Sequence, residues 1–252
     1  MTDIHAVTGI SHAVLLFLHL LLMVAWLGID VGVFCASFFL RNPGYPIEQR
    51  LMIGRLAGLL DMGPRASLLL MYPTGAWLAW AGGWGFEQPL GPFSPLTILV
   101  TISAAFLIWE AGVWVQFWGH RRVLAGGFGP GLGKFLHQYR RWDIYARWLL
   151  AALLISDGFF GILGKGFILQ PWLGWKVLLF GLIVLQGIGI RWAADAWPAL
   201  IRDIVDHGST PQREAALNRA MLRAYPFVLI LWGLILVIAF IGIIKVPGLP
   251  PG

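Results

Sequence analysis

Charged residues are scarce in this chain. Only 12% of its 252 residues are Asp, Glu, Lys or Arg, whereas an average soluble domain has about 25%. Apolar residues make up 58%, and they form long runs, as a bilayer core about 30 Å thick requires of a spanning helix. This composition excludes an ordinary soluble globule. It predicts an all-α fold, a polytopic membrane helix bundle whose outer surface contacts the lipid bilayer.

Cysteine is almost absent. The only one, Cys35, lies in an apolar run, which excludes an intramolecular disulfide and a cysteine-based metal cluster. Redox chemistry in this chain would therefore need a bound cofactor. Lys and Arg are missing from the first forty residues, so the basic start of a cleaved secretory signal is lacking and we expect the first helix to remain in the mature protein.

Nucleic-acid and nucleotide ligands are not expected. The net charge of +6 is a weak indicator, because in a membrane protein the distribution of Lys and Arg matters more than their total. The glycine-rich stretch 126–134 ends in Gly133-Lys134 but fails the phosphate-loop pattern, since Phe128 and Phe135 stand where that pattern needs Gly and Ser or Thr.

About six segments are long enough to span a bilayer, and we expect them to form one integral membrane domain over residues 1–252. The expected spans are 13–40, 65–84, 95–118, 145–168, 172–194 and 225–246. Two connections, 47–60 and 211–222, have the pattern of amphipathic helices that lie at the membrane surface.

The basic residues predict the orientation. The connection 41–65 holds four Lys or Arg residues, 119–147 holds six and 191–224 holds five, which makes fifteen of the eighteen in the chain. Because loops rich in Lys and Arg stay in the cytoplasm, both termini are expected to be periplasmic. The expected location is the bacterial inner (cytoplasmic) membrane.

The first span carries a polar stripe. His12, His19, Trp26 and Asp30 are spaced by 7, 7 and 4 residues, which keeps them on one face of a helix. Polar side chains that face lipid are costly, so this stripe should point into the bundle. His19 lies deep enough to bind a haem iron or another metal, although an intramembrane His also commonly serves as a hydrogen-bonding residue. For His12 an interfacial role is favoured.

The remaining ionisable groups in the spans favour structural roles. Asp30 is placed to pair with Arg65, unless Asp61 does so at i, i+4. Glu110 and Asp157 face each other's helices if the third and fourth spans form a hairpin, and hydrogen bonding is favoured over a proton path between them.

Several segments resemble a known family. The first helix, with Leu18-His19 followed by Trp26-Leu27-Gly28, resembles the opening helix of the HemJ-type membrane protoporphyrinogen oxidases, and the copper-resistance D (CopD) family is similar in the same place. Residues 172–179 (WLGWKVLL) resemble the oxidases' Trp-Leu-His-x-Lys-Leu-x-Leu segment, with Gly174 in place of the His. Residues 223–245 resemble that family's last helix.

The resemblance implies a cofactor site. It implies that His19 is the axial ligand of a b-type haem, and that Lys176 stands where the family has its functionally important lysine. The family has four helices, which implies a similar core over 13–84 and 172–246 and an inserted helix pair at 86–168. Trp26 would then form part of the pocket wall.

Three functions follow as hypotheses. The first is a haem b protein of the inner membrane that acts in redox or electron transfer. The second is a non-catalytic accessory subunit of a larger respiratory or photosynthetic complex, which would need other membrane subunits as partners. The third is copper handling by His12, His19 and Met ligands, although such soft ligands are few here.

Overall fold

The computed structural model describes the backbone of residues 2–124 and 130–245, and the side chains of 11–119 and 133–245. The described residues form helices and no strand, in the order α1 Thr2–Leu40, α2 Ile47–Leu60, α3 Met62–Ala81, α4 Pro95–Leu124, α5 Pro130–Ile162, α6 Pro171–Ala194, α7 Trp197–His207, α8 Pro211–Leu222 and α9 Tyr225–Ile244. The expected all-α bundle is confirmed.

The chain is a multi-pass helical membrane protein. In the described ranges, five helical segments are long and apolar enough to cross a bilayer: 11–40, 95–119, 133–162, 171–207 and 211–244. Their outward faces remain apolar, with Phe17, Ile108 and Ile243 between 63% and 80% exposed. Such surfaces suit contact with lipid rather than water.

The expected span 65–84 coincides with α3, which is not among those five segments. This helix contacts α1, α2 and α4, and it buries nine residues, among them Leu69 and Pro73. The exact number of spans therefore stays a prediction.

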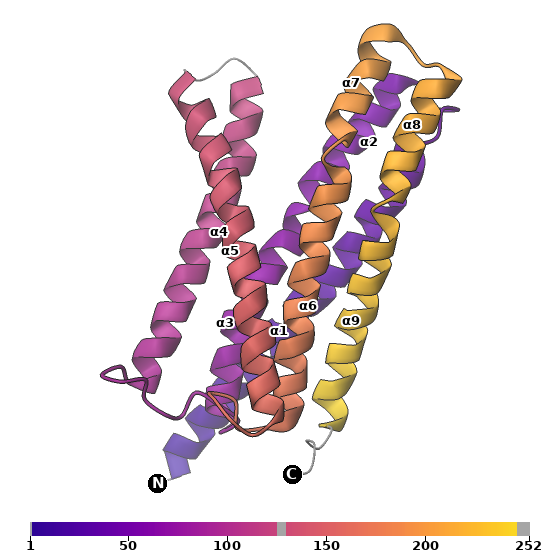
Figure 1. The fold of residues 1–252 in the computed structure, drawn as a ribbon. Coiled ribbons are helices and arrows are strands. Elements are labelled where there is room, and N and C mark those ends of the chain that lie inside the picture. The colour runs from indigo at the N-terminus through magenta and orange to yellow at the C-terminus, as the bar shows by residue number, and fades with distance from the viewer. Residues whose placement is uncertain (1, 125–129, 246–252) are drawn as a thin grey trace.

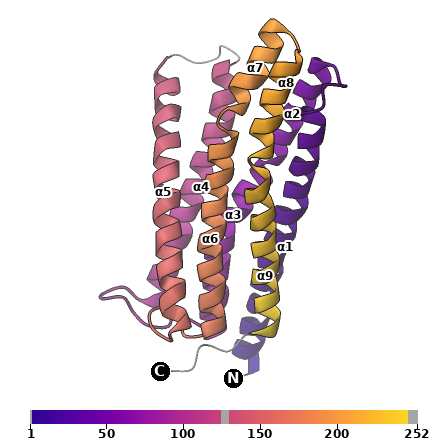
Figure 2. The same ribbon diagram turned by 45° about the vertical axis from the view of Figure 1, so that its right-hand side comes forward.

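The helices stand side by side as a bundle (Figures 1 and 2). The start of α1, the end of α9 and the connections α3–α4 and α5–α6 lie at one end, which we call the terminal end. The connections α1–α2 and α7–α8, the end of α4 and the start of α5 lie at the opposite end, which we call the basic end. Which end faces the cytoplasm stays a prediction.

Two sequence boundaries need correction. The expected loop 119–147 is largely helical, because α4 runs to Leu124 and α5 already begins at Pro130; proline suits that first helical position. Residues 163–168, expected within a span, form a turn instead. The glycine-rich stretch 126–134 lies partly outside the described residues. Helices over the two expected ranges 47–60 and 211–222 are confirmed as α2 and α8, and their place at the membrane surface stays a prediction. The helix α7 was not expected.

The core joins the main helices through one apolar cluster. It contains Trp26 of α1, Leu69 of α3, Phe106 of α4, Leu154 of α5, Ile183 of α6 and Leu231 of α9. Close packing of α5 on α6 depends on small residues, since a Cβ added at Gly158 would lie 2.3 Å from the backbone nitrogen of Leu178. Glycine permits this approach of two backbones.

Candidate functional site

The polar stripe of α1 faces the bundle, as the sequence predicted. Trp26 is buried, and His12, His19 and Asp30 are half-buried. Residues on the opposite face, such as Phe17, are exposed. The stripe therefore places its hydrogen-bonding groups against neighbouring helices rather than lipid.

The imidazole of His19 is held by Thr74 on α3. His19 Nδ1 lies 2.9 Å from the hydroxyl oxygen of Thr74, and that hydroxyl donates to the carbonyl of Leu70 at 2.9 Å. A hydroxyl has one proton, so when Thr74 donates it to a backbone carbonyl, Thr74 accepts a hydrogen bond from the Nδ1–H of His19. The other ring nitrogen, Nε2, then carries a lone pair. None of the hydrogen bonds between described residues involves it.

Lys176 approaches the same region from α6. Its ammonium group lies 5.8 Å from the ring centre of Trp172 and close enough to His19 for its charge to act on the imidazole. A Cβ at Gly242 of α9 would lie 3.0 Å from Nζ, so the absence of a side chain there leaves room for the ammonium group. No described carboxylate pairs with Lys176.

A second lysine joins the aromatic residues at the terminal end. Lys245 Nζ lies 5.0 Å from the ring centre of Trp84 and 5.8 Å from that of Trp172. The edge of His12 meets Trp84, with 5.9 Å between the ring centres. Lys245 caps α9 with a left-handed backbone, φ 47°, which a non-glycine residue rarely adopts. The structure thus brings together two lysines, two tryptophans and His12 from four segments of the chain.

The backbone of the terminal-end loops fixes Trp84. Phe86 N donates to Phe167 O, and Leu169 N donates to Trp84 O, both at 2.9 Å. These bonds tie the α3–α4 connection to the α5–α6 connection. Trp84 therefore has a defined position beside Trp172, 5.1 Å away between ring centres.

Trp26, expected in a pocket wall, belongs to the core. It is only 4% exposed, and its ring meets the edge of Phe180 on α6. It lies seven residues along α1 from His19, about 10 Å at 1.5 Å per residue. Trp26 can therefore line a site at His19 only on the side that faces the middle of the bundle.

The ionisable residues left open by the sequence have local partners. Asp30 accepts a hydrogen bond from Trp232 Nε1 at 2.7 Å, and Arg65 pairs with Asp61 rather than with Asp30. The i, i+4 alternative is thus the correct one. Glu110 accepts from Trp114 Nε1, one turn along the same helix, at 2.6 Å.

Glu110 and Asp157 do not meet. Trp109 opposite Asp143 sets the register of the α4–α5 hairpin, and Asp157 lies fourteen residues beyond Asp143, roughly 21 Å along α5. A proton path between these two carboxyl groups is therefore not supported. Asp157 instead lies where its charge acts on Tyr72 of α3.

Sequence analysis missed a buried ion cluster between α4, α5 and α6. Asp143 accepts from Trp109 Nε1 at 2.7 Å, from Arg147 Nε at 3.2 Å and from Arg191 Nη1. The side chains of Asp143 and Arg147 are almost fully buried. Arg147 and Arg191, which the sequence groups with the basic connections, instead neutralise a carboxylate inside the bundle. The only sequence signal was the i, i+4 spacing of Asp143 and Arg147.

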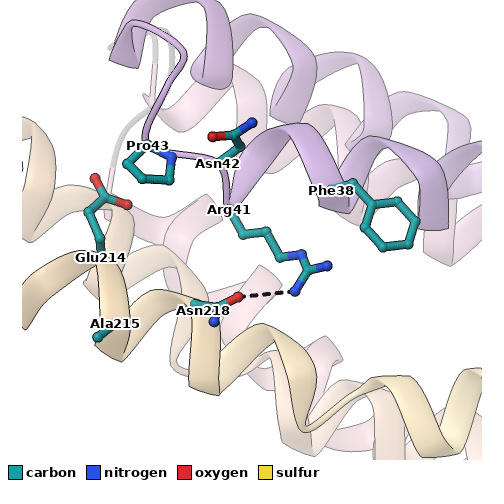
Figure 3. Close-up of a pocket in the computed structure, with 7 residues that line it drawn as sticks. All are labelled: Phe38, Arg41, Asn42, Pro43, Glu214, Ala215 and Asn218. Carbon is teal, nitrogen blue, oxygen red and sulfur yellow. Dashed lines mark hydrogen bonds between the residues drawn. The ribbon is translucent and has the colours of Figure 1, made fainter. Parts of the chain in front are cut away.

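A surface pocket of about 470 Å³ lies at the basic end, away from His19. Figure 3 shows that Arg41 Nη1 points to the side-chain oxygen of Asn218, to which it donates at 3.1 Å. The pocket lies between the end of α1 and α8. Its lining residues are Phe38, Arg41, Asn42, Pro43, Glu214, Ala215 and Asn218.

Within the described residues, no group of three or more His, Cys, Asp or Glu side chains is placed to hold a metal ion. The copper-handling hypothesis, which needs several protein ligands, gains no support from this arrangement. A haem iron differs, because the porphyrin supplies four of its ligands and one His suffices.

Comparisons with known proteins returned no relative. No family model, curated protein or solved structure matches this chain.

Proposed function

We propose that this chain is a haem b-binding protein of the bacterial inner membrane that acts in redox or electron transfer, with His19 as the axial ligand. The observation that carries the proposal is the hydrogen bond between His19 and Thr74. It favours the tautomer whose Nε2 lone pair is available for iron. Histidines that bind metals typically donate their other N–H to a fixed acceptor in this way.

The donor set suits a haem. A neutral imidazole binds iron without burying an anion, and His19 lies within the apolar segment 11–40 of α1. Among the described residues, neither Lys176 nor Lys245 has a carboxylate partner. Haem propionates are carboxylates that such groups would pair with. Trp26 would contribute an apolar wall on the interior side. A bound haem would supply one-electron redox chemistry.

Gly174 marks a difference from the family that the chain resembles. A Cβ at this position would lie 2.5 Å from the backbone nitrogen of Ile162 on α5. The His that the oxidases carry here therefore has no room while α5 packs on α6. The proposal accordingly assigns haem binding to His19 alone and assigns no porphyrinogen oxidation.

Paired substitutions test the proposal. His19→Ala should abolish the Soret absorption of the purified protein, because it removes the ligand atom. His12→Ala is the matched control, since it removes a histidine from the same face of α1 and should leave the spectrum intact. Helical content by circular dichroism verifies that both variants fold. A haem spectrum that survives in folded His19→Ala would refute the assignment.

The accessory-subunit hypothesis predicts a different result. The wild-type protein would then be colourless, and extraction in mild detergent would recover it with stoichiometric partners.

A further inference from the structure

A ladder of charged residues runs from the basic end into the bundle between α5 and α6. The outermost pair, Arg140 and Asp195, is 2.9 Å apart with side chains 58% and 71% exposed. One turn deeper, Arg191 pairs with Asp143, whose side chain is fully buried. Arg147, a further turn along α5, also binds Asp143. Exposure thus falls step by step toward the interior.

At the deepest step of the ladder, two buried polar atoms lack hydrogen-bond partners among the described residues. Arg147 Nη2 and Glu110 Oε2 are both buried, and neither has a hydrogen-bond partner among the described residues. The two charges act on each other, but the groups are farther apart than an ion pair. Leaving a buried polar atom unpaired destabilises the folded state. A molecule that both accepts from Nη2 and donates to Oε2 would remove both costs, and water does so.

Several charged groups surround Glu110, so protonation of Glu110 changes the net charge of a buried cluster. The α5 side contributes Arg147, Asp143 and Tyr139, and α6 contributes Arg191. On α3, Arg65 acts on Arg191 and is itself paired with Asp61; on α4, Trp114 donates to Oε1 of Glu110.

Two arginines facing Asp143 leave one positive charge in excess. An ionised Glu110 cancels that charge, and a protonated Glu110 restores it. The state of this one carboxyl group therefore decides whether the cluster is neutral.

We propose that Glu110, at the inner end of this ladder, is an exchangeable proton-binding site inside the membrane that exchanges its proton through a water bound between Arg147 and Glu110. In the release step, the proton on Oε2 moves to the water oxygen, which leaves a carboxylate on Glu110 and a hydronium ion that exchanges with solvent. Arg147 Nη2 donates to the water and balances the carboxylate that forms. Uptake is the reverse, and no electron is transferred. The site does not depend on haem.

Infrared spectroscopy of the whole protein in lipid vesicles tests the proposal. The carboxylic-acid C=O band of Glu110 should grow as the pH falls and should shift when H₂O is replaced by D₂O. Glu110→Gln should remove this band because it removes the carboxyl group. Asp157→Asn removes another half-buried carboxyl group and is the matched control that should keep the band.

Three results would overturn the proposal: no pH-dependent acid band in the wild type, a band that survives in Glu110→Gln, or a band insensitive to D₂O. If Glu110→Gln does not fold, Trp114→Phe decides the question. It keeps the carboxyl group but removes the hydrogen bond to Oε1, so the band should change frequency; an unchanged band would contradict the assignment.

Discussion

Thr74 fixes the ring of His19 across the α1–α3 interface, with 2.9 Å between the hydroxyl oxygen and Nδ1. The hydroxyl is itself committed to backbone carbonyls of the preceding turn. Both carbonyls belong to α3, so this helix fixes the position of the hydroxyl. The orientation of His19 therefore depends on a helix far away in sequence.

Loss of this hydroxyl should weaken haem binding. We expect Thr74→Val to lower haem affinity about 10- to 100-fold, as loss of an outer-shell partner typically does. Haem titration into the purified apoprotein measures this. Thr101→Val is the control, since Thr101 is exposed on α4 and bonds only within its own helix. Equal affinities for the two variants would show that Thr74 does not position the ligand.

Removal of the carboxylate in the buried ion cluster should destabilise the bundle. Asp143→Asn removes the carboxylate that both arginines bind, and we expect a loss of about 3–5 kcal/mol. Asp195→Asn breaks the exposed pair with Arg140 and should cost at most about 1 kcal/mol. Thermal unfolding in detergent, followed by near-UV circular dichroism, compares them. Similar melting temperatures for both variants would contradict a stabilising role for Asp143.

The close packing of α5 and α6 predicts a sharp contrast between two glycines of α6. Gly174→Ala places a methyl group within 3 Å of α5 backbone atoms, which only a separation of the helices can relieve. A cost of about 1–3 kcal/mol is expected. Gly187→Ala meets nothing within 4 Å and should be neutral. The same unfolding assay distinguishes them, and a harmless Gly174→Ala would indicate that the interface is looser than described.

The orientation can be read by labelling single cysteines. In a Cys35→Ser background, Leu90→Cys at the terminal end should react with an impermeant maleimide on intact spheroplasts. Tyr45→Cys at the basic end should react only after permeabilisation. Both positions are exposed in the protein itself. A difference in labelling therefore reports the side of the membrane and not burial within the protein. The reverse pattern would invert the predicted topology.

The features that the sequence predicts correctly are those set by the spacing of residues within one helix. The stripe of α1 and the Asp61–Arg65 pair depend on residues 4 or 7 apart on one helix, and both were found. The cluster around Asp143 joins α5 to Trp109 and to Arg191, 34 and 48 residues away. Such pairing depends on how helices pack, which residue spacing does not reveal. Lys245 beside Trp84 was missed for the same reason.

Boundaries failed where polar residues lie inside a helix. Residues 130–144 contain several charged side chains and were expected to form a loop, yet α5 begins at Pro130. Asp143 and Arg147 are buried, and their ion pairs offset the cost of removing the two charges from water. Hydropathy alone cannot distinguish such paired charges from solvated ones.

The absorption spectrum of the gently purified wild-type protein, oxidised and then reduced with dithionite, tests the central claim most directly. The proposed function predicts a b-type reduced-minus-oxidised difference at about one haem per chain. A colourless protein that also fails to take up added haem would contradict it.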